Sequence, residues 1–166
     1  MTSNGVVTAL TIASGVSVVP SVITDNATNN YFTISGAGHI SGSASIVKSG
    51  PSTLAINTAN TFSGTVDVQA GTLQTGNGAA LGTTAGGTTV EAGATLDING
   101  QNLGGEVITI NGAGVGGAGA LINSGAAQAQ AFRSINLGSD ATIGGASGAT
   151  IGVNKQRRRS QFERCL

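Results

Sequence analysis

Two carboxylates in the middle of the chain have a spacing that could support acid–base chemistry on a sugar. Asp67 lies in TVDVQ and Glu91 lies in TTVEA. If Val68 and Val90 are equivalent positions of successive repeats, both carboxylates point outward, ~8 Å apart along the backbone, a distance compatible with an inverting glycosidase. Because no aromatic residue, lysine or arginine accompanies the pair to bind a sugar, we predict no catalytic residue. A polysaccharide lyase or hydrolase remains the alternative.

The other residues that could hold a ligand are isolated in the sequence. His39, the only histidine, lies among glycines in SGAGHISG, where we expect a loop residue rather than a ligand or base. Cys165 is the only cysteine, so it has no partner for an internal disulfide or a metal site. The stretch GSDATIGG at 138–145 lacks the GGxGxD spacing of calcium-binding repeats. We therefore predict no metal site and no cofactor. Asn26-Ala-Thr28 matches the N-glycosylation pattern, which matters only in a eukaryotic secretory context.

The charges divide the chain into an acidic body and a basic tail. Residues 1–153 contain only Lys48 and Arg133 as basic residues against six acidic ones. Residues 154–166 contain five basic residues, three of them in the run RRR at 157–159. Such a run could neutralise phosphates or touch an anionic membrane. It lacks interleaved aromatics and a folded context, so we expect a disordered tail and no nucleic-acid partner.

Length and composition favour one folded domain of small residues. The 166 residues include 28 glycines, and aromatic residues make up 3% of the chain. Aliphatic residues nevertheless recur throughout and the mean hydropathy is +0.20, so disorder is not expected. The sequence contains no run of about eighteen apolar residues, so we expect no membrane span.

Aliphatic residues repeat with a period near 22. The first column contains residues spaced by 22, 22, 20 and 25, namely Ile46, Val68, Val90, Ile110 and Ile135. The second contains residues spaced by 23, 25 and 22, namely Leu73, Leu96, Leu121 and Ile143. Ile34 and Ile56 form another 22-residue pair. A period of this length is typical of one coil of a β-solenoid and is too short for a propeller blade.

The residues around each column alternate between apolar and polar, as short strands with one buried face do. The expected strands lie within 65–69, 54–57, 96–99 and 108–111. Helix is disfavoured because glycine interrupts most windows, and only AAQAQAFRS at 126–134 could form a turn or two. The same segment could instead form a longer loop that protrudes from the coils or serves as a spacer. An ice-binding face would need aligned Thr-x-Thr arrays, and TTV at 88–90 does not align into one.

The gaps between the strands are filled by residues that suit sharp corners. Coils stacked ~4.8 Å apart place like side chains in one inward ladder. A corner that is sandwiched between coils favours glycine at positive φ and small residues that hydrogen-bond locally. We therefore predict an all-β fold of about six or seven coils over residues 1–153.

Residues 50–82, GPSTLAINTANTFSGTVDVQAGTLQTGNGAALG, resemble the autotransporter-associated β-strand repeat, also called the passenger-associated transport repeat. The resemblance is carried by elements in the family's order, which are Gly50, Leu54, Ile56, Ala59 to Gly64, Val66, Val68, Gly71 to Leu73 and Ala80 to Gly82. Stretches 88–104 and 108–128 also look like sequence downstream of that repeat. The resemblance covers about residues 30–145.

The resemblance implies a right-handed parallel β-helix in the passenger of a protein exported by type V secretion to the surface of Gram-negative-type bacteria. It implies an outer-membrane anchor elsewhere, and passengers of this kind are often adhesins or virulence-related. The chain begins without a signal-peptide pattern and ends without barrel-type strands, so we expect a piece of a longer passenger. We expect a structural stalk whose partners are further coils of the passenger, or other copies stacked end to end, with any surface ligand unidentified.

Overall fold

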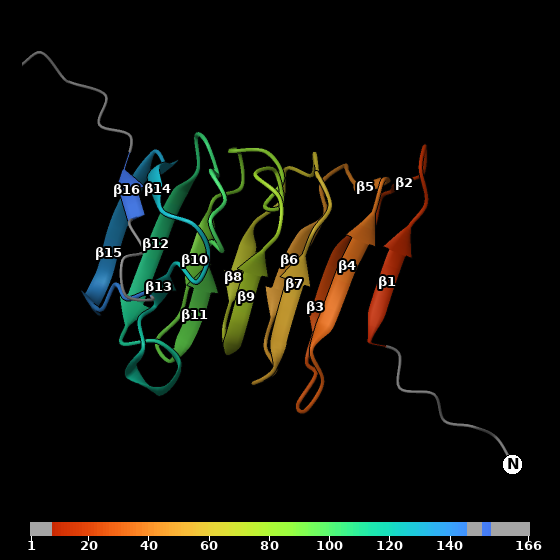
Figure 1. Cartoon of the computed structure of the whole chain (residues 1–166). Coiled ribbons are helices and arrows are strands. Elements are labelled where there is room, and N and C mark those ends of the chain that lie inside the picture. The colour runs from red at the N-terminus through yellow and green to blue at the C-terminus, as the bar shows by residue number, and fades with distance from the viewer. Residues whose placement is uncertain (1–7, 146–150, 154–166) are drawn as a thin grey trace, which may run out of the picture.

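The computed structural model describes residues 8–145 and 151–153, which wind into a parallel β-solenoid of about six turns (Figure 1). Each turn contributes one short strand to each of two long sheets, and the strands advance along the axis in the order of the sequence. All pairings between the strands are parallel. The predicted solenoid is therefore confirmed.

Both long sheets have six strands. The first sheet, in spatial order, consists of β1 (Ala9–Ile12), β4 (Phe32–Gly36), β7 (Thr53–Ile56), β9 (Gly71–Thr75), β11 (Ala94–Asp97) and β13 (Leu121–Ile122). The second sheet consists of β3 (Val22–Asp25), β6 (Ser45–Lys48), β8 (Val66–Val68), β10 (Thr88–Val90), β12 (Val107–Gly112) and β15 (Ser134–Ala141). Two small sheets pair β2 (Ser17–Val18) with β5 (His39–Ile40), and β14 (Gln128–Phe132) with β16 (Ile151–Val153). A 3-10 turn, η1, spans Val115–Gly117.

The second aliphatic column forms the inward ladder that its spacing predicts. Leu73 pairs with Leu96, and Leu96 pairs with Leu121. An isolated bridge then joins Leu121 to Ile143. The pair Ile34 and Ile56 is also in register. Like side chains thus lie on one another along the axis, and most are fully buried.

The register predicted for the first aliphatic column is confirmed in the middle of the column and is wrong at both ends. Val68, Val90 and Ile110 are in register, but Ile46 pairs with Val66, and Ile110 pairs with Leu137. Side chains alternate faces with a period of two, so a slip of two residues leaves the same set buried. Hydrophobic alternation alone therefore cannot distinguish a 20-residue step from a 22-residue step.

Glycine is required at some corners because the neighbouring coil leaves no room for a side chain. Gly71 has φ of 67°, and an added Cβ would lie 2.3 Å from the Ser52 carbonyl oxygen. Gly82 has φ of 79°, and its Cβ would lie 2.4 Å from the Phe62 carbonyl oxygen. Both the positive φ and the close backbone approach exclude other residues.

Two local predictions were wrong. His39 lies in β5 rather than in a loop, because its backbone N–H donates to the Val16 carbonyl of the preceding coil at 3.1 Å. The segment 126–134 forms neither a helical turn nor a simple loop, since β14 runs through Gln128–Phe132. Ala131 and Phe132 in this strand are buried, and burial of this pair under the last coils outweighs the helix propensity of the alanines.

Candidate functional site

The structure places Asp67 and Glu91 on adjacent coils of the second sheet, two residues out of register, as predicted. Asp67 in β8 pairs with Thr89, and Glu91 follows β10 with its N–H donating to the Val68 carbonyl at 2.8 Å. The Asp67 Oδ2 accepts a hydrogen bond from the Gln69 amide at 2.7 Å, while its Oδ1 is buried and has no hydrogen-bond partner in the described part of the chain. Glu91 is exposed. Polysaccharide cleavage by this pair stays the alternative prediction.

The outer face of the second sheet shows how the small polar residues are arranged along the axis. The row that contains Asp67 consists, in register, of Thr24, Val47, Asp67, Thr89, Thr109 and Asn136. Valine and aspartate interrupt the threonines, so this row does not form the repeated array that an ice-binding surface needs.

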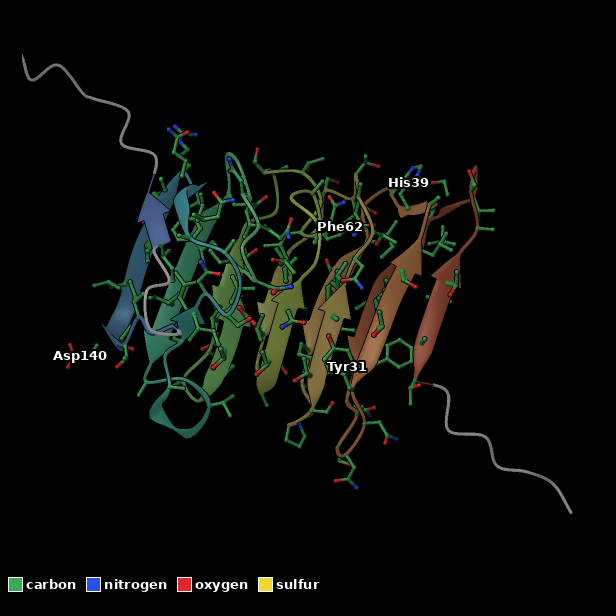
Figure 2. All side chains as sticks on the ribbon, viewed as in Figure 1. Tyr31, His39, Phe62 and Asp140 are labelled. Carbon is green, nitrogen blue, oxygen red and sulfur yellow. The ribbon has the colours of Figure 1, made fainter. Side chains whose placement is uncertain are left out.

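Asn60 at the corner between β7 and β8 joins three successive coils. Its Oδ1 accepts the Ile40 backbone N–H at 3.0 Å, and its Nδ2 donates to the Ala80 carbonyl at 2.8 Å. Asn60 is buried, as is Phe62 two residues later. Figure 2 shows that Phe62 and His39 lie on the side of the solenoid away from Tyr31. Asn60 and Phe62 belong to the motif quoted above, and the structure gives both residues a packing role between the coils.

A hydrogen-bonded line of polar side chains crosses the outer face of the first sheet. Tyr31 donates to the Gln74 Oε1 at 2.8 Å, and Gln74 donates to the Asp97 Oδ2 at 2.9 Å. The Ser124 hydroxyl donates to the same oxygen at 2.5 Å, and the Asn99 and Ser124 backbone N–H groups donate to Asp97 Oδ1. The buried Asp97 therefore accepts four hydrogen bonds: two from Ser124 tie its turn to the next coil, one from Gln74 ties it to the preceding coil, and one from Asn99 lies within its own turn.

The second sheet carries an ion pair in its inward ladder near the first turn. Asp25 of β3 and Lys48 of β6 are register partners, and Lys48 Nζ lies 3.5 Å from Asp25 Oδ2. Lys48 is fully buried, and its ammonium also donates to the Gly50 carbonyl. Burial lowers the Lys48 pKa, and the Asp25 charge only partly opposes that effect. From β8 onward, valine, valine, isoleucine and leucine occupy the same row.

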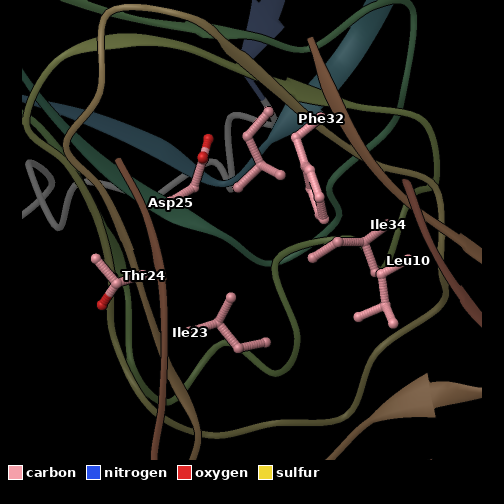
Figure 3. Close-up of a pocket in the computed structure, with 7 residues that line it drawn as sticks. Leu10, Ile23, Thr24, Asp25, Phe32 and Ile34 are labelled. Carbon is pink, nitrogen blue, oxygen red and sulfur yellow. The ribbon is translucent and has the colours of Figure 1, made fainter. Parts of the chain in front are cut away.

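A cavity of about 240 Å³ lies beside this pair at the first turn (Figure 3). Its lining consists of Leu10, Ile23, Thr24, Asp25, Phe32, Ile34 and Leu54. Ile23 and Asp25 lie on the cavity side of β3, whereas the Thr24 side chain points away from the cavity. One sequence feature marks this site, although the sequence analysis did not predict it. Lys48 follows Ile46 by two residues and so has the parity of a buried position.

Glu106 is another buried titratable group. It precedes β12, is 3% exposed, and among the described residues its carboxyl group makes no hydrogen bond or ion pair. Its backbone carbonyl accepts the Arg133 N–H of the next coil at 2.9 Å. Desolvation raises the pKa of the Glu106 carboxyl to about 7.

Within residues 8–145 and 151–153, no three His, Cys, Asp or Glu side chains come together as a metal site. No helix in the same part of the chain is long and apolar enough to cross a membrane. The arginine run at 157–159 and Cys165 lie outside the described residues, as does the proposed tail 154–166 as a whole. Asp140 lies in β15, at the opposite end of the solenoid from β1 (Figure 2).

Comparison with protein families gives a match to part of the chain. Residues 46–75 match the model of the passenger-associated-transport-repeat, an autotransporter passenger repeat family. The matched segment contains β7, β8 and β9 and all but the first residue of β6, so it supplies two strands to each long sheet. Comparison of the chain with curated proteins gives no match, and comparison with solved structures gives none either.

Proposed function

We propose that this chain, whose residues 46–75 match an autotransporter passenger repeat, is a surface-exposed stalk segment of an autotransporter passenger. The observation that carries the proposal is the position of the matched repeat. It provides two consecutive strands of each long sheet in the middle of one uninterrupted solenoid. Repeats of this kind stack on one another and so form an elongated, rigid structure.

The distribution of side chains supports a structural role. The interior is filled by aliphatic ladders, and its buried side chains form a hydrophobic cluster that runs from Ile12 to Phe132. The polar groups at Asn60 and Asp97 are used in hydrogen bonds between coils. Each coil is thus stabilised by its neighbours, which suits a stalk that must resist proteases and mechanical load outside the cell.

Surface display tests this proposal. The chain is placed between an export signal and an outer-membrane anchoring barrel in a Gram-negative host, and whole cells are treated with protease. We expect the chain to reach the surface and to resist cleavage for much longer than a variant with Val68→Asp, which puts a charge into the ladder next to Val90.

Thr65→Asp is the matched control. It introduces the same charge one residue before β8, at an exposed position. We expect this variant to be displayed and protected like the parent chain. Cleavage of the parent chain as fast as the Val68→Asp variant would contradict a folded stalk at the cell surface.

We also propose that the two ends stack on further coils, either of the same passenger or of another copy. At the first turn, β1 and β3 are the last strands of their sheets, and Leu10 and Val22 are 43% and 52% exposed. At the other end, β15 is a last strand and Leu137 is 66% exposed. Exposed edges with apolar side chains favour pairing with another chain.

Light scattering over a range of concentrations measures this association. We expect the mass to rise with concentration in the parent chain, and to stay at that of a monomer when Val22→Lys places a charge on the edge strand.

We further propose that the displayed chain is adhesive, a proposal that rests on the resemblance to the passenger repeat family. It predicts binding of the displayed chain to host-cell or glycan surfaces beyond that of cells with the anchoring barrel alone.

A further inference from the structure

We propose that Lys48 and Asp25 are joined by an intramolecular isopeptide bond, which covalently links the first two turns of the solenoid. The proposal concerns a modification of the protein and does not depend on where the chain is displayed. It rests on the placement of the two side chains, on their surroundings, and on the groups that hold them.

The two side chains are held against each other by the sheet. Asp25 and Lys48 are direct register partners on the parallel strands β3 and β6, in the inward row of the second sheet. Lys48 Nζ lies 3.5 Å from Asp25 Oδ2. The strand pairing fixes both backbones and so holds the amine close to the carboxyl group. This proximity raises the effective concentration of the reacting groups.

Both reacting side chains are largely shielded from solvent. The Lys48 side chain is 0% exposed and the Asp25 side chain is 10% exposed. Asp25 borders a cavity whose other inward side chains are apolar. A charged pair is costly in such surroundings, whereas a neutral amide with satisfied hydrogen bonds is tolerated. The lowered pKa of Lys48 supports the presence of the free amine, which is the nucleophile.

The remaining contacts suit the chemistry of amide formation. Asp25 Oδ1 accepts the Ala27 backbone N–H at 3.0 Å, so this donor is in place to stabilise negative charge on Oδ1. Asp25 Oδ2 is buried and accepts no hydrogen bond from the residues that the structure describes, which leaves it as the leaving oxygen. The hydrogen bond from Lys48 Nζ to the Gly50 carbonyl orients the amine.

The step balances without any further reagent. One ammonium proton of Lys48 passes to Asp25 Oδ2, and the free amine attacks Cγ to form the new N–C bond. A second proton moves from nitrogen to Oδ2, the Cγ–Oδ2 bond breaks, and water leaves. One ammonium and one carboxylate thus become one secondary amide and one water molecule, with no oxidation or reduction.

Such a bond would act where stacking is weakest. The first turn has a neighbouring coil on one side only within the described residues, and its inward Leu10 is 43% exposed. In later coils, the row of Lys48 is filled by aliphatic residues that stack on both sides. A covalent link between β3 and β6 would keep the first turn from separating from the second turn by local unfolding.

Mass spectrometry of the purified full chain tests the proposal. We expect an intact mass about 18 Da below that of the uncondensed chain, and a branched peptide after proteolysis that joins Asp25 to Lys48. Lys155 is the only other lysine and provides an internal control for amine labelling after denaturation. Lys155 should be labelled and Lys48 should not.

Two variants complete the experiment. Lys48→Arg keeps a positive charge but removes the amine, and Asp25→Ala removes the carboxyl group, so both should have the full mass expected from their sequences. Full mass in the parent chain, with Lys48 labelled as completely as Lys155, overturns the proposal. A loss of water that maps to another aspartate, as in succinimide formation, also overturns it.

Discussion

Replacement of Glu106 by glutamine should change how the stability of the solenoid depends on pH. Glu106 is 3% exposed and sits at the corner before β12. Its pKa is raised to about 7 from an ordinary value of 4.5 because burial disfavours the charged form. Glutamine has nearly the same shape but cannot ionise.

The sign and size of this pH effect follow from the difference between the pKa of Glu106 in the folded state and its pKa in the unfolded state. A group whose folded pKa is raised binds more protons in the folded state, so its contribution is fully present below pH 4.5 and is lost as the pH rises through 7. Each unit of pKa difference corresponds to about 1.4 kcal/mol, which gives about 3 kcal/mol for the whole shift. Water that reaches the carboxylate after ionisation reduces this value, so we expect the free energy of unfolding of the parent chain to fall by roughly 1 to 3 kcal/mol relative to Glu106→Gln.

Urea unfolding followed by circular dichroism, at pH values from 4.5 to 8, measures the free energy of unfolding of both proteins. All other ionisable groups are present in both proteins, so the difference between the two profiles isolates Glu106. Glu91→Gln, which removes an exposed carboxylate in the neighbouring turn, controls for the loss of one charge. A difference between the parent chain and Glu106→Gln that stays constant across this pH range would refute the reasoning.

Two further substitutions test the contacts between coils. Asn60→Ala removes the side chain that joins Ile40 and Ala80, leaving a buried N–H and a buried carbonyl unpaired. We expect a loss of about 2 to 4 kcal/mol in urea unfolding, and a loss below 0.5 kcal/mol would show that these groups find other partners. Leu96→Ala, in the centre of the ladder between Leu73 and Leu121, should cost about 2 to 5 kcal/mol. Thermal unfolding of this variant at an unchanged temperature would argue against the ladder as the source of stability.

The repeat and the faces of its strands could be predicted because they depend on local alternation. Spacing alone predicts Leu73, Leu96 and Leu121 in one ladder, and the structure confirms it. The partner of Ile46 was assigned wrongly, since a two-residue slip conserves the buried face and the aliphatic character of the column. The register depends on the exact length of each corner. The alternation in the sequence does not distinguish corners that differ in length by two residues.

The groups of chemical interest were harder to foresee. Asp97 and Ser124 are 27 residues apart and meet only because the coil between them closes at that length. The pairing of Asp25 with Lys48 depends on the 23-residue step from β3 to β6, whereas the neighbouring step from β6 to β8 is 20 residues. A change of two residues in the first step would place Lys48 against another residue of the row.

The amino-acid sequence by itself determined the class of fold, because glycine-rich corners and a 22-residue aliphatic period are compatible with stacked coils and with little else. It also determined which side chains face inward, since that property needs only the two-residue alternation of a strand. Tertiary structure alone decided which residues become neighbours across the coils, including the buried pair Asp25 and Lys48, and it decided the burial of Glu106. Those contacts depend on how each corner packs on the coils beside it, and that packing is a property of the whole stack.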